Sequence, residues 1–98
     1  MPVIIAKIKS KKESIEIVKR ALIEIAKYVN KNEKGTLNYF ITQDNKEKNI
    51  FFTYEKFLSH EDMEIHNSSE ALKKFLEATK GHLEKDINIF SGNNIEYI

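Results

Sequence analysis

The chain is 98 residues long, which is enough for one hydrophobic core but not for two, so we expect a single domain over residues 1–98. Its 41% hydrophobic and 32% charged residues are typical of a folded globular protein, and with no apolar run near the roughly 18 residues of a membrane helix we expect no membrane association and a cytoplasmic location. The net charge is only +1, and the absence of cysteine excludes disulfides, thiolate metal sites and cysteine nucleophiles.

The chain opens with a predicted strand and an amphipathic helix. Residues 3–9 alternate and are rich in β-branched side chains, which predicts the strand. Ser10 and Glu13 then fit a capping box, in which each side chain satisfies the backbone amide of the other residue. Apolar residues recur at steps of three and four up to about Asn30 and predict one buried helix face, made of Ile15, Val18, Leu22, Ile25, Ala26 and Val29.

Basic residues gather in this first part of the chain. Residues 1–34 hold nine Lys and Arg against four Asp and Glu, whereas residues 35–98 hold seven against eleven. Such an asymmetry can mark a nucleic-acid-binding face. Here the basic side chains are interleaved with acidic ones on the exposed side of the helix, which favours a solvated surface. We therefore predict no nucleic-acid partner.

Two strong strand patterns follow, over residues 36–42 and 50–58, separated by a polar loop that predicts an antiparallel hairpin. In the second strand, alternation divides the side chains between two faces. One face would carry Phe51, Thr53, Glu55 and Phe57, and the other Ile50, Phe52, Tyr54 and Lys56. Because both faces contain large apolar residues, we expect helices on one face and a partner molecule on the other.

The second half of the chain predicts a broken helical stretch and a last strand. Ser59 begins the first helical piece, with acidic residues where the helix dipole favours them. Asn67 and Glu70 fit a second cap, before a helix that runs toward Gly81. Ile87, Ile89 and Phe90 predict the strand, and residues 93–98 form a tail. The order β-α-β-β-α-β predicts a ferredoxin-like α+β fold, an antiparallel sheet with its helices on one face.

Glu55 and His66 are the most promising pair for chemistry. Glu55 projects from an apolar strand face, where a carboxylate is costly unless it finds a partner. His66 lies between the two helical pieces, where its side chain can turn toward the sheet. Such a carboxylate would orient and tune an imidazole base. The same pair could equally be a hydrogen bond that only holds a helix against the sheet.

Other candidates are weaker. His60, Glu64 and His66 are close in sequence, but a solvated acidic helix explains them better than a metal site, so we expect no metal. Aromatic residues of the hairpin and the last helix either make the core or line an apolar pocket. As pocket residues we single out Phe52, Phe57 and Phe75.

Three segments carry recognisable motifs: Glu-Lys-Gly-Thr-Leu-Asn-Tyr at 33–39, Phe-Thr-Tyr-Glu-Lys-Phe at 52–57 and His-Asn-Ser-Ser at 66–69. They resemble the E-x-G-(C/T)-L-x-Y opening of the second strand, the strand with Glu two residues before Trp, and the H-x-x-S helix start of the antibiotic biosynthesis monooxygenase family. That family includes quinol monooxygenases and relatives of haem-degrading enzymes. The resemblance covers roughly residues 3–90.

The resemblance implies a homodimer whose sheets face each other to form a dimeric α+β barrel, with a pocket in each subunit. It also implies oxidation of a small quinol or phenolic aromatic substrate by molecular oxygen, with no metal or other cofactor. By motif, His66 would be the base and Glu55 its orienting partner, while Asn38 and Tyr39 are candidates for substrate contact.

The chain departs from the family pattern at positions that matter for function. Phe57 stands where the family often has Trp, which removes an indole N–H donor. Leu76 lies near the position of the axial His of haem-degrading relatives, and His66 replaces a Trp of their pattern, so haem binding and degradation are disfavoured. Two functions stay open: a monooxygenase, and a non-catalytic small-molecule-binding or stress-response protein that uses the same pocket.

Overall fold

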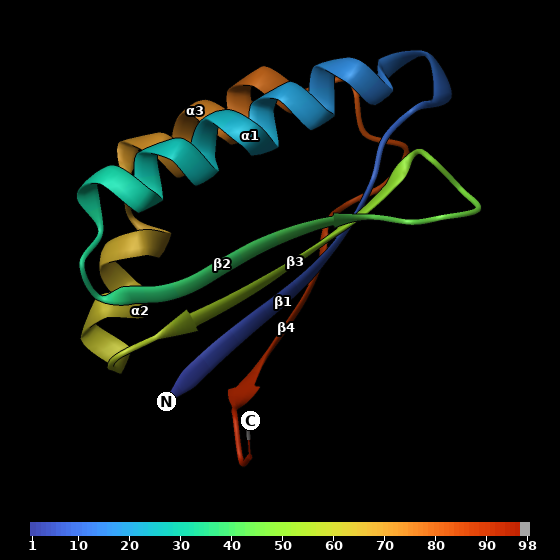
Figure 1. Ribbon diagram of the computed structural model, residues 1–98. Helices are drawn as coiled ribbons and strands as arrows, with labels where there is room; N and C mark the ends of the chain where they lie inside the picture. Colours follow the sequence, from blue (N-terminus) through green and yellow to red (C-terminus); the bar gives the residue numbers. More distant parts are fainter. Residues whose placement is uncertain (97–98) are drawn as a thin grey trace.

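The computed structural model describes residues 1–96 and contains one four-stranded sheet covered by helices on one face (Figure 1). The strands are β1 (Pro2–Lys9), β2 (Thr36–Gln43), β3 (Ile50–Phe57) and β4 (Asn88–Asn93). The helices are η1 (Lys12–Ser14, a 3₁₀ turn), α1 (Ile15–Asn32), α2 (His60–Asn67) and α3 (Glu70–Thr79). The predicted order of elements and the ferredoxin-like α+β fold are confirmed.

The sheet has the order β2-β3-β1-β4, and every neighbouring pair is antiparallel. β1 therefore lies between β3 and β4, as the split βαβ arrangement requires. The register places Ile4 of β1 and Tyr39 of β2 on either side of Glu55 in β3. These three residues share the face that the helices cover, so the register brings Glu55 to the middle of the inner face.

The core lies between this inner face and the helices. The predicted periodicity of α1 is confirmed at its centre, where Val18, Leu22, Ile25 and Val29 are all buried. They pack with Ile8 of β1, Phe51 of β3 and Phe75 of α3. The outer face carries exposed apolar side chains, namely Ile5, Phe40 and Phe90. Within residues 1–96, no helix is long and apolar enough to span a membrane.

The capping box predicted at Ser10 and Glu13 is wrong. Ser10 is fully buried, and its amide donates to the backbone carbonyl of Asn49 at 2.8 Å, while its hydroxyl donates to the carbonyl of Lys11. A second hydrogen bond joins the two residues, since the side-chain amide of Asn49 donates to the Ser10 carbonyl. A tertiary contact between β1 and the loop before β3 therefore uses the amide that Glu13 was expected to satisfy, and the helical turn begins later, at Lys12.

The cap predicted at Asn67 is also misplaced. Asn67 is the last residue of α2, and the residue that caps α3 is Ser69, whose hydroxyl accepts from the amide of Leu72. The cap of α2 itself lies at Ser59, whose hydroxyl accepts from the amide of Asp62. At the end of the chain, β4 extends to Asn93, so the predicted tail begins one residue later, and its residues 97–98 lie outside the described part.

Candidate functional site

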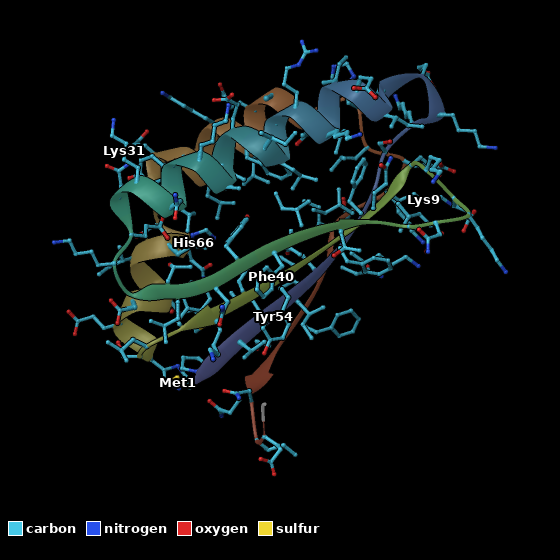
Figure 2. The ribbon with its side chains drawn as sticks, in the orientation of Figure 1. Met1, Lys9, Lys31, Phe40, Tyr54 and His66 are labelled. Carbon is cyan, nitrogen blue, oxygen red and sulfur yellow. The ribbon has the colours of Figure 1, made fainter. Side chains whose placement is uncertain are left out.

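His66 lies in the last turn of α2 and points from that helix toward the inner face of the sheet. Figure 2 shows it in the space between helices and sheet, near the end of α1. Its side chain is only 2% exposed. The imidazole ring is flanked by two aromatic rings, Tyr39 with a centroid separation of 5.6 Å and Phe57 with 5.5 Å. The prediction that His66 turns toward the sheet is confirmed.

Two buried carboxylates hold the imidazole, one at each nitrogen. Nε2 of His66 lies 3.2 Å from Oε1 of Glu55, so the predicted partners meet. Nδ1 forms a 2.8 Å hydrogen bond with Oε1 of Glu33, a residue for which the sequence indicated no role. Threonine hydroxyls support both acids: Thr53 donates to the second oxygen of Glu55, and Thr36 donates to Oε1 of Glu33, each at 2.8 Å. The three ionisable side chains form one buried chain.

The charges in this chain change the protonation of its members. Burial lowers the pKa of His66, but the hydrogen bond and the negative charge of Glu55, together with those of Glu33, outweigh it and leave the pKa above its ordinary value. The pKa of Tyr39 is raised as well. Burial, followed by the charges of Glu55 and Glu33, raises its pKa, so its hydroxyl keeps its proton at neutral pH and can donate it in a hydrogen bond.

A glycine explains how the end of α1 reaches this site. Glu33 caps α1, its amide donating to the carbonyl of Val29, and the chain then turns into β2. At Gly35 the backbone passes so close to α2 that a Cβ there would overlap the side chain of Asp62. The Gly35 carbonyl also accepts from the amide of Leu58, which fixes the turn to the end of β3. This close approach places Glu33 opposite His66.

A cavity of about 270 Å³ extends from the site between the sheet and the helices. His66, Glu55, Thr53 and Tyr39 line its polar end, with Asn67 beside them. The remaining wall is apolar and comes from all the major layers: Ile4, Ala6, Ile8, Leu22, Ile25, Leu72, Phe75, Leu76, Ile87 and Ile89. An apolar chamber with a few convergent polar groups has the composition of a small-molecule site.

The residues predicted to line a pocket divide into three groups. Tyr39 and Phe75 line the cavity. Phe57 is fully buried and packs on the His66 ring without lining the cavity. Asn38 and Phe52 lie on the outer face of the sheet, paired in register with Lys56 and Thr42, and neither lines this cavity. For Asn38 and Phe52 the expected placement is corrected, because strand alternation turns them away from their inward-facing neighbours Tyr39 and Thr53.

No role for Glu33, Thr36 or Thr53 was predicted from the sequence. Glu33 is the first residue of the motif at residues 33–39, and that motif was the only sign in the sequence that Glu33 belongs to the site. Thr53 shares the strand face of Glu55 two residues away, the spacing from which a hydroxyl can reach a carboxylate. His60, in contrast, is exposed, so His60 and His66 do not converge on a common ligand. No metal-binding cluster of three His, Asp or Glu side chains occurs among residues 1–96.

Comparisons with known proteins point to one family. The sequence profile of the antibiotic biosynthesis monooxygenases matches residues 1–78. Among solved structures, a protein of Nitrosomonas europaea described as a candidate antibiotic biosynthesis monooxygenase superposes with a TM-score of 0.92 at 17% identity, covering 98% of this chain and 100% of its own. A counterpart from Deinococcus radiodurans gives 0.89 at 20% identity, covering 100% and 96%. A search of curated proteins found no match.

Proposed function

The chain belongs to the antibiotic biosynthesis monooxygenase family, and from that premise we propose that it is a cofactor-independent monooxygenase that oxidises a small quinol or other phenolic aromatic with molecular oxygen. The observation that carries the proposal is the contact between His66 and Glu55 at the polar end of the cavity. A buried imidazole that a carboxylate supports, beside an apolar cavity, can act as the general base that deprotonates a phenol.

The proposed reaction uses the substrate as its own reductant. A 1,4-quinol and one molecule of dioxygen give a hydroxyquinone and one molecule of water. One oxygen atom enters the ring, the other leaves as water, and the quinol supplies all four electrons. Dioxygen reacts slowly with closed-shell molecules, but an electron-rich phenolate can transfer an electron to it. The first requirement on the protein is therefore to remove the hydroxyl proton.

His66 is the proposed base, and Glu55 supports it. In its neutral form His66 accepts the substrate's hydroxyl proton at Nε2, and the nearby carboxylate of Glu55 stabilises the resulting imidazolium. The raised pKa of His66 makes it a stronger base than free imidazole, at the cost of being neutral only at higher pH. Tyr39 keeps its proton and is the proposed hydrogen-bond donor to the phenolate oxygen.

The apolar wall supports the proposal in a second way. Aliphatic and aromatic side chains would contact the faces of a flat ring, while the polar end fixes the hydroxyl beside His66. The cavity volume of about 270 Å³ is enough for a small ring system.

Oxygen uptake with a panel of reduced quinones tests this function. We expect turnover by metal-stripped wild-type protein, and a loss of about 10²–10⁴-fold in rate for His66→Gln and Glu55→Gln, the usual contribution of a positioned base. His60→Gln, on the exposed side of the same helix, is the matched control and should keep full activity. No turnover of any quinol, or turnover that His66→Gln leaves unchanged, would reject the mechanism.

A specific observation favours a second candidate, a non-catalytic binding protein. Both nitrogens of His66 already face carboxylates, an arrangement that would also serve only to hold α2 against the sheet. In that case the same cavity would hold an apolar small molecule without changing it. Quinones and phenols would then raise the thermal unfolding temperature, as ligands that bind only the folded state do, and no product would form.

We also propose that the protein is a homodimer joined through the outer sheet face. Ile5, Phe40 and Phe90 are each more than 40% exposed there, and Phe40 stacks on Tyr54 with ring centroids 6.5 Å apart. A sheet face of this composition is unfavourable in water and is suited to burial against an identical face.

A further inference from the structure

We propose that Glu33 is a positioning residue for His66: its hydrogen bond to Nδ1 fixes the imidazole tautomer and strengthens the hold of His66 on the proton taken from the substrate. This inference rests on the proposed function. Glu33 does not line the cavity, so it would not touch the substrate and would act only through His66.

The geometry favours one neutral tautomer, because Nδ1 makes the shorter carboxylate contact, 2.8 Å to Glu33 against 3.2 Å from Nε2 to Glu55. A carboxylate can only accept, so the 2.8 Å hydrogen bond between Nδ1 of His66 and Oε1 of Glu33 requires the proton on Nδ1. In the neutral ring, Nε2 then carries the lone pair, at the edge that faces Glu55 and the cavity. That is the nitrogen that must be free to accept a proton from a bound hydroxyl. Without Glu33, the contact with Glu55 would favour the opposite tautomer, which has no free lone pair there.

Glu33 is placed for an interaction with a charged imidazole. Its side chain is 5% exposed, and Oε1 accepts from both His66 and Thr36. Its second oxygen, Oε2, is buried and has no hydrogen-bond partner within residues 1–96. A buried carboxylate with one unfilled oxygen gains most from an adjacent positive charge, so it stabilises imidazolium more than neutral imidazole.

The proposed reaction requires His66 to keep the proton that it takes from the substrate. Oxidation of a quinol to a hydroxyquinone and water releases no net proton, so the proton taken from the substrate must return to the oxygen that leaves as water. The ionisable groups around His66 are Glu33 from the end of α1, Glu55 from β3 and Tyr39 from β2, and Tyr39 keeps its own proton. With both acids ionised, the three-residue chain keeps a net charge of −1 after His66 is protonated.

NMR of the imidazole nitrogens and ring protons tests the inference without any substrate. In wild-type protein at high pH we expect the Nδ1-protonated tautomer of His66. In Glu33→Gln we expect its titration to move down by about one pH unit, the effect of removing one nearby opposite charge, and the Nε2-protonated tautomer to gain. Glu24→Gln, on the exposed face of α1, is the matched control, with His60 and His82 as internal references.

The pH dependence of kcat/KM gives the second readout. Activity should fall below the pKa of His66 in wild-type protein, and this acidic limb should move down by the same amount in Glu33→Gln. Glu33→Asp keeps the charge on a shorter side chain. In this variant His66 should titrate between its values in wild type and Glu33→Gln, which provides a test even if Glu33→Gln folds poorly. An unchanged titration and tautomer of His66 in both variants would overturn the inference. Failure of the proposed function would appear instead as an inactive wild-type protein whose His66 still responds to Glu33→Gln.

Discussion

The two faces of the sheet differ in how their side chains are covered. On the inner face, residues of β1, β2 and β3 meet the helices, whereas β4 is exposed along its whole length. The one ionisable residue on the inner face of β3, Glu55, is buried with a full set of partners. On the outer face, Phe40 and Phe90 remain 57% and 59% exposed. The inner face can therefore hold a charge because its neighbours are fixed, whereas the outer face has apolar surface that still lacks a covering layer.

The candidate site and the proposed dimer interface lie on opposite faces of the sheet. The cavity and its ionisable chain lie entirely on the helix side, and the outer face carries none of their residues. Substitutions on the inner face should therefore change stability and chemistry together. Substitutions on the outer face should change association while leaving the folded subunit intact.

Replacing His66 should have the largest effect. In His66→Leu, two buried carboxylates lose their common partner, and we expect the free energy of unfolding to fall by about 3–5 kcal/mol at neutral pH. Urea denaturation at neutral pH measures the loss, and the exposed control His60→Leu should stay within about 0.5 kcal/mol of wild type. A neutral effect of His66→Leu would contradict a charged chain.

Two phenylalanines compare the faces directly. Phe75 is 6% exposed and lines the cavity, so Phe75→Ala should lower the free energy of unfolding by about 3–5 kcal/mol. Phe40→Ala removes an exposed ring and should change the stability of the isolated subunit by well under half of that. Thermal or urea unfolding at low protein concentration measures both changes in the free energy of unfolding. Equal losses at the two sites would show that the outer ring is already buried against a partner.

The outer face should determine the oligomeric state. If two copies meet there, Phe40→Lys and Phe90→Lys should each weaken the dimer by about 3–6 kcal/mol, because a symmetric dimer buries two copies of each ring, and should shift the sedimentation profile toward monomer. Lys27→Ala on the exposed face of α1 should leave the profile unchanged. A wild-type protein that sediments as a monomer at all concentrations would reject the homodimer.

The ionisable chain should also make stability depend on pH. The pKa of His66 is raised in the folded protein, so its contribution is fully present below about pH 6.5 and is lost as pH rises through the folded pKa. In that window the free energy of unfolding should fall by at most about 1.4 kcal/mol per pH unit. Urea midpoints between pH 6 and 9 would show the slope, and His60→Gln should retain it. A rise in stability with pH would contradict the assignment.

Much of this fold follows from local patterns in the sequence. The period of α1 predicted its buried centre, because one buried face imposes that spacing. The alternation of β3 predicted which side chains face the helices, although Ile50 and Lys56 on the other face are buried as well. The contact between Glu55 and His66 was also predictable, since a carboxylate on an apolar strand face needs a partner. The caps were less predictable. Ser10 satisfied the local pattern, but a tertiary hydrogen bond from the Ser10 amide to the Asn49 carbonyl displaced the expected cap.

Other parts of the site depend on contacts that no local pattern reveals. Glu33 lies 33 residues from His66 in sequence and reaches it only because the backbone at Gly35 passes close against α2. Asn38 and Tyr39 are neighbours in β2, and alternation allows only one of them to face the cavity. The register shift between Thr36 and Asn38 complicates the choice, which pairing with β3 decides in favour of Tyr39.

The most direct test of the central claim follows the two atoms of dioxygen. With ¹⁸O₂ and a reduced quinone, we expect wild-type and His60→Gln protein to place one ¹⁸O atom in the hydroxyquinone and one in water. Product formation should fall by about 10²–10⁴-fold in His66→Gln. A product without ¹⁸O, accompanied by hydrogen peroxide, or full incorporation in His66→Gln, would contradict a monooxygenase that uses His66 as its base.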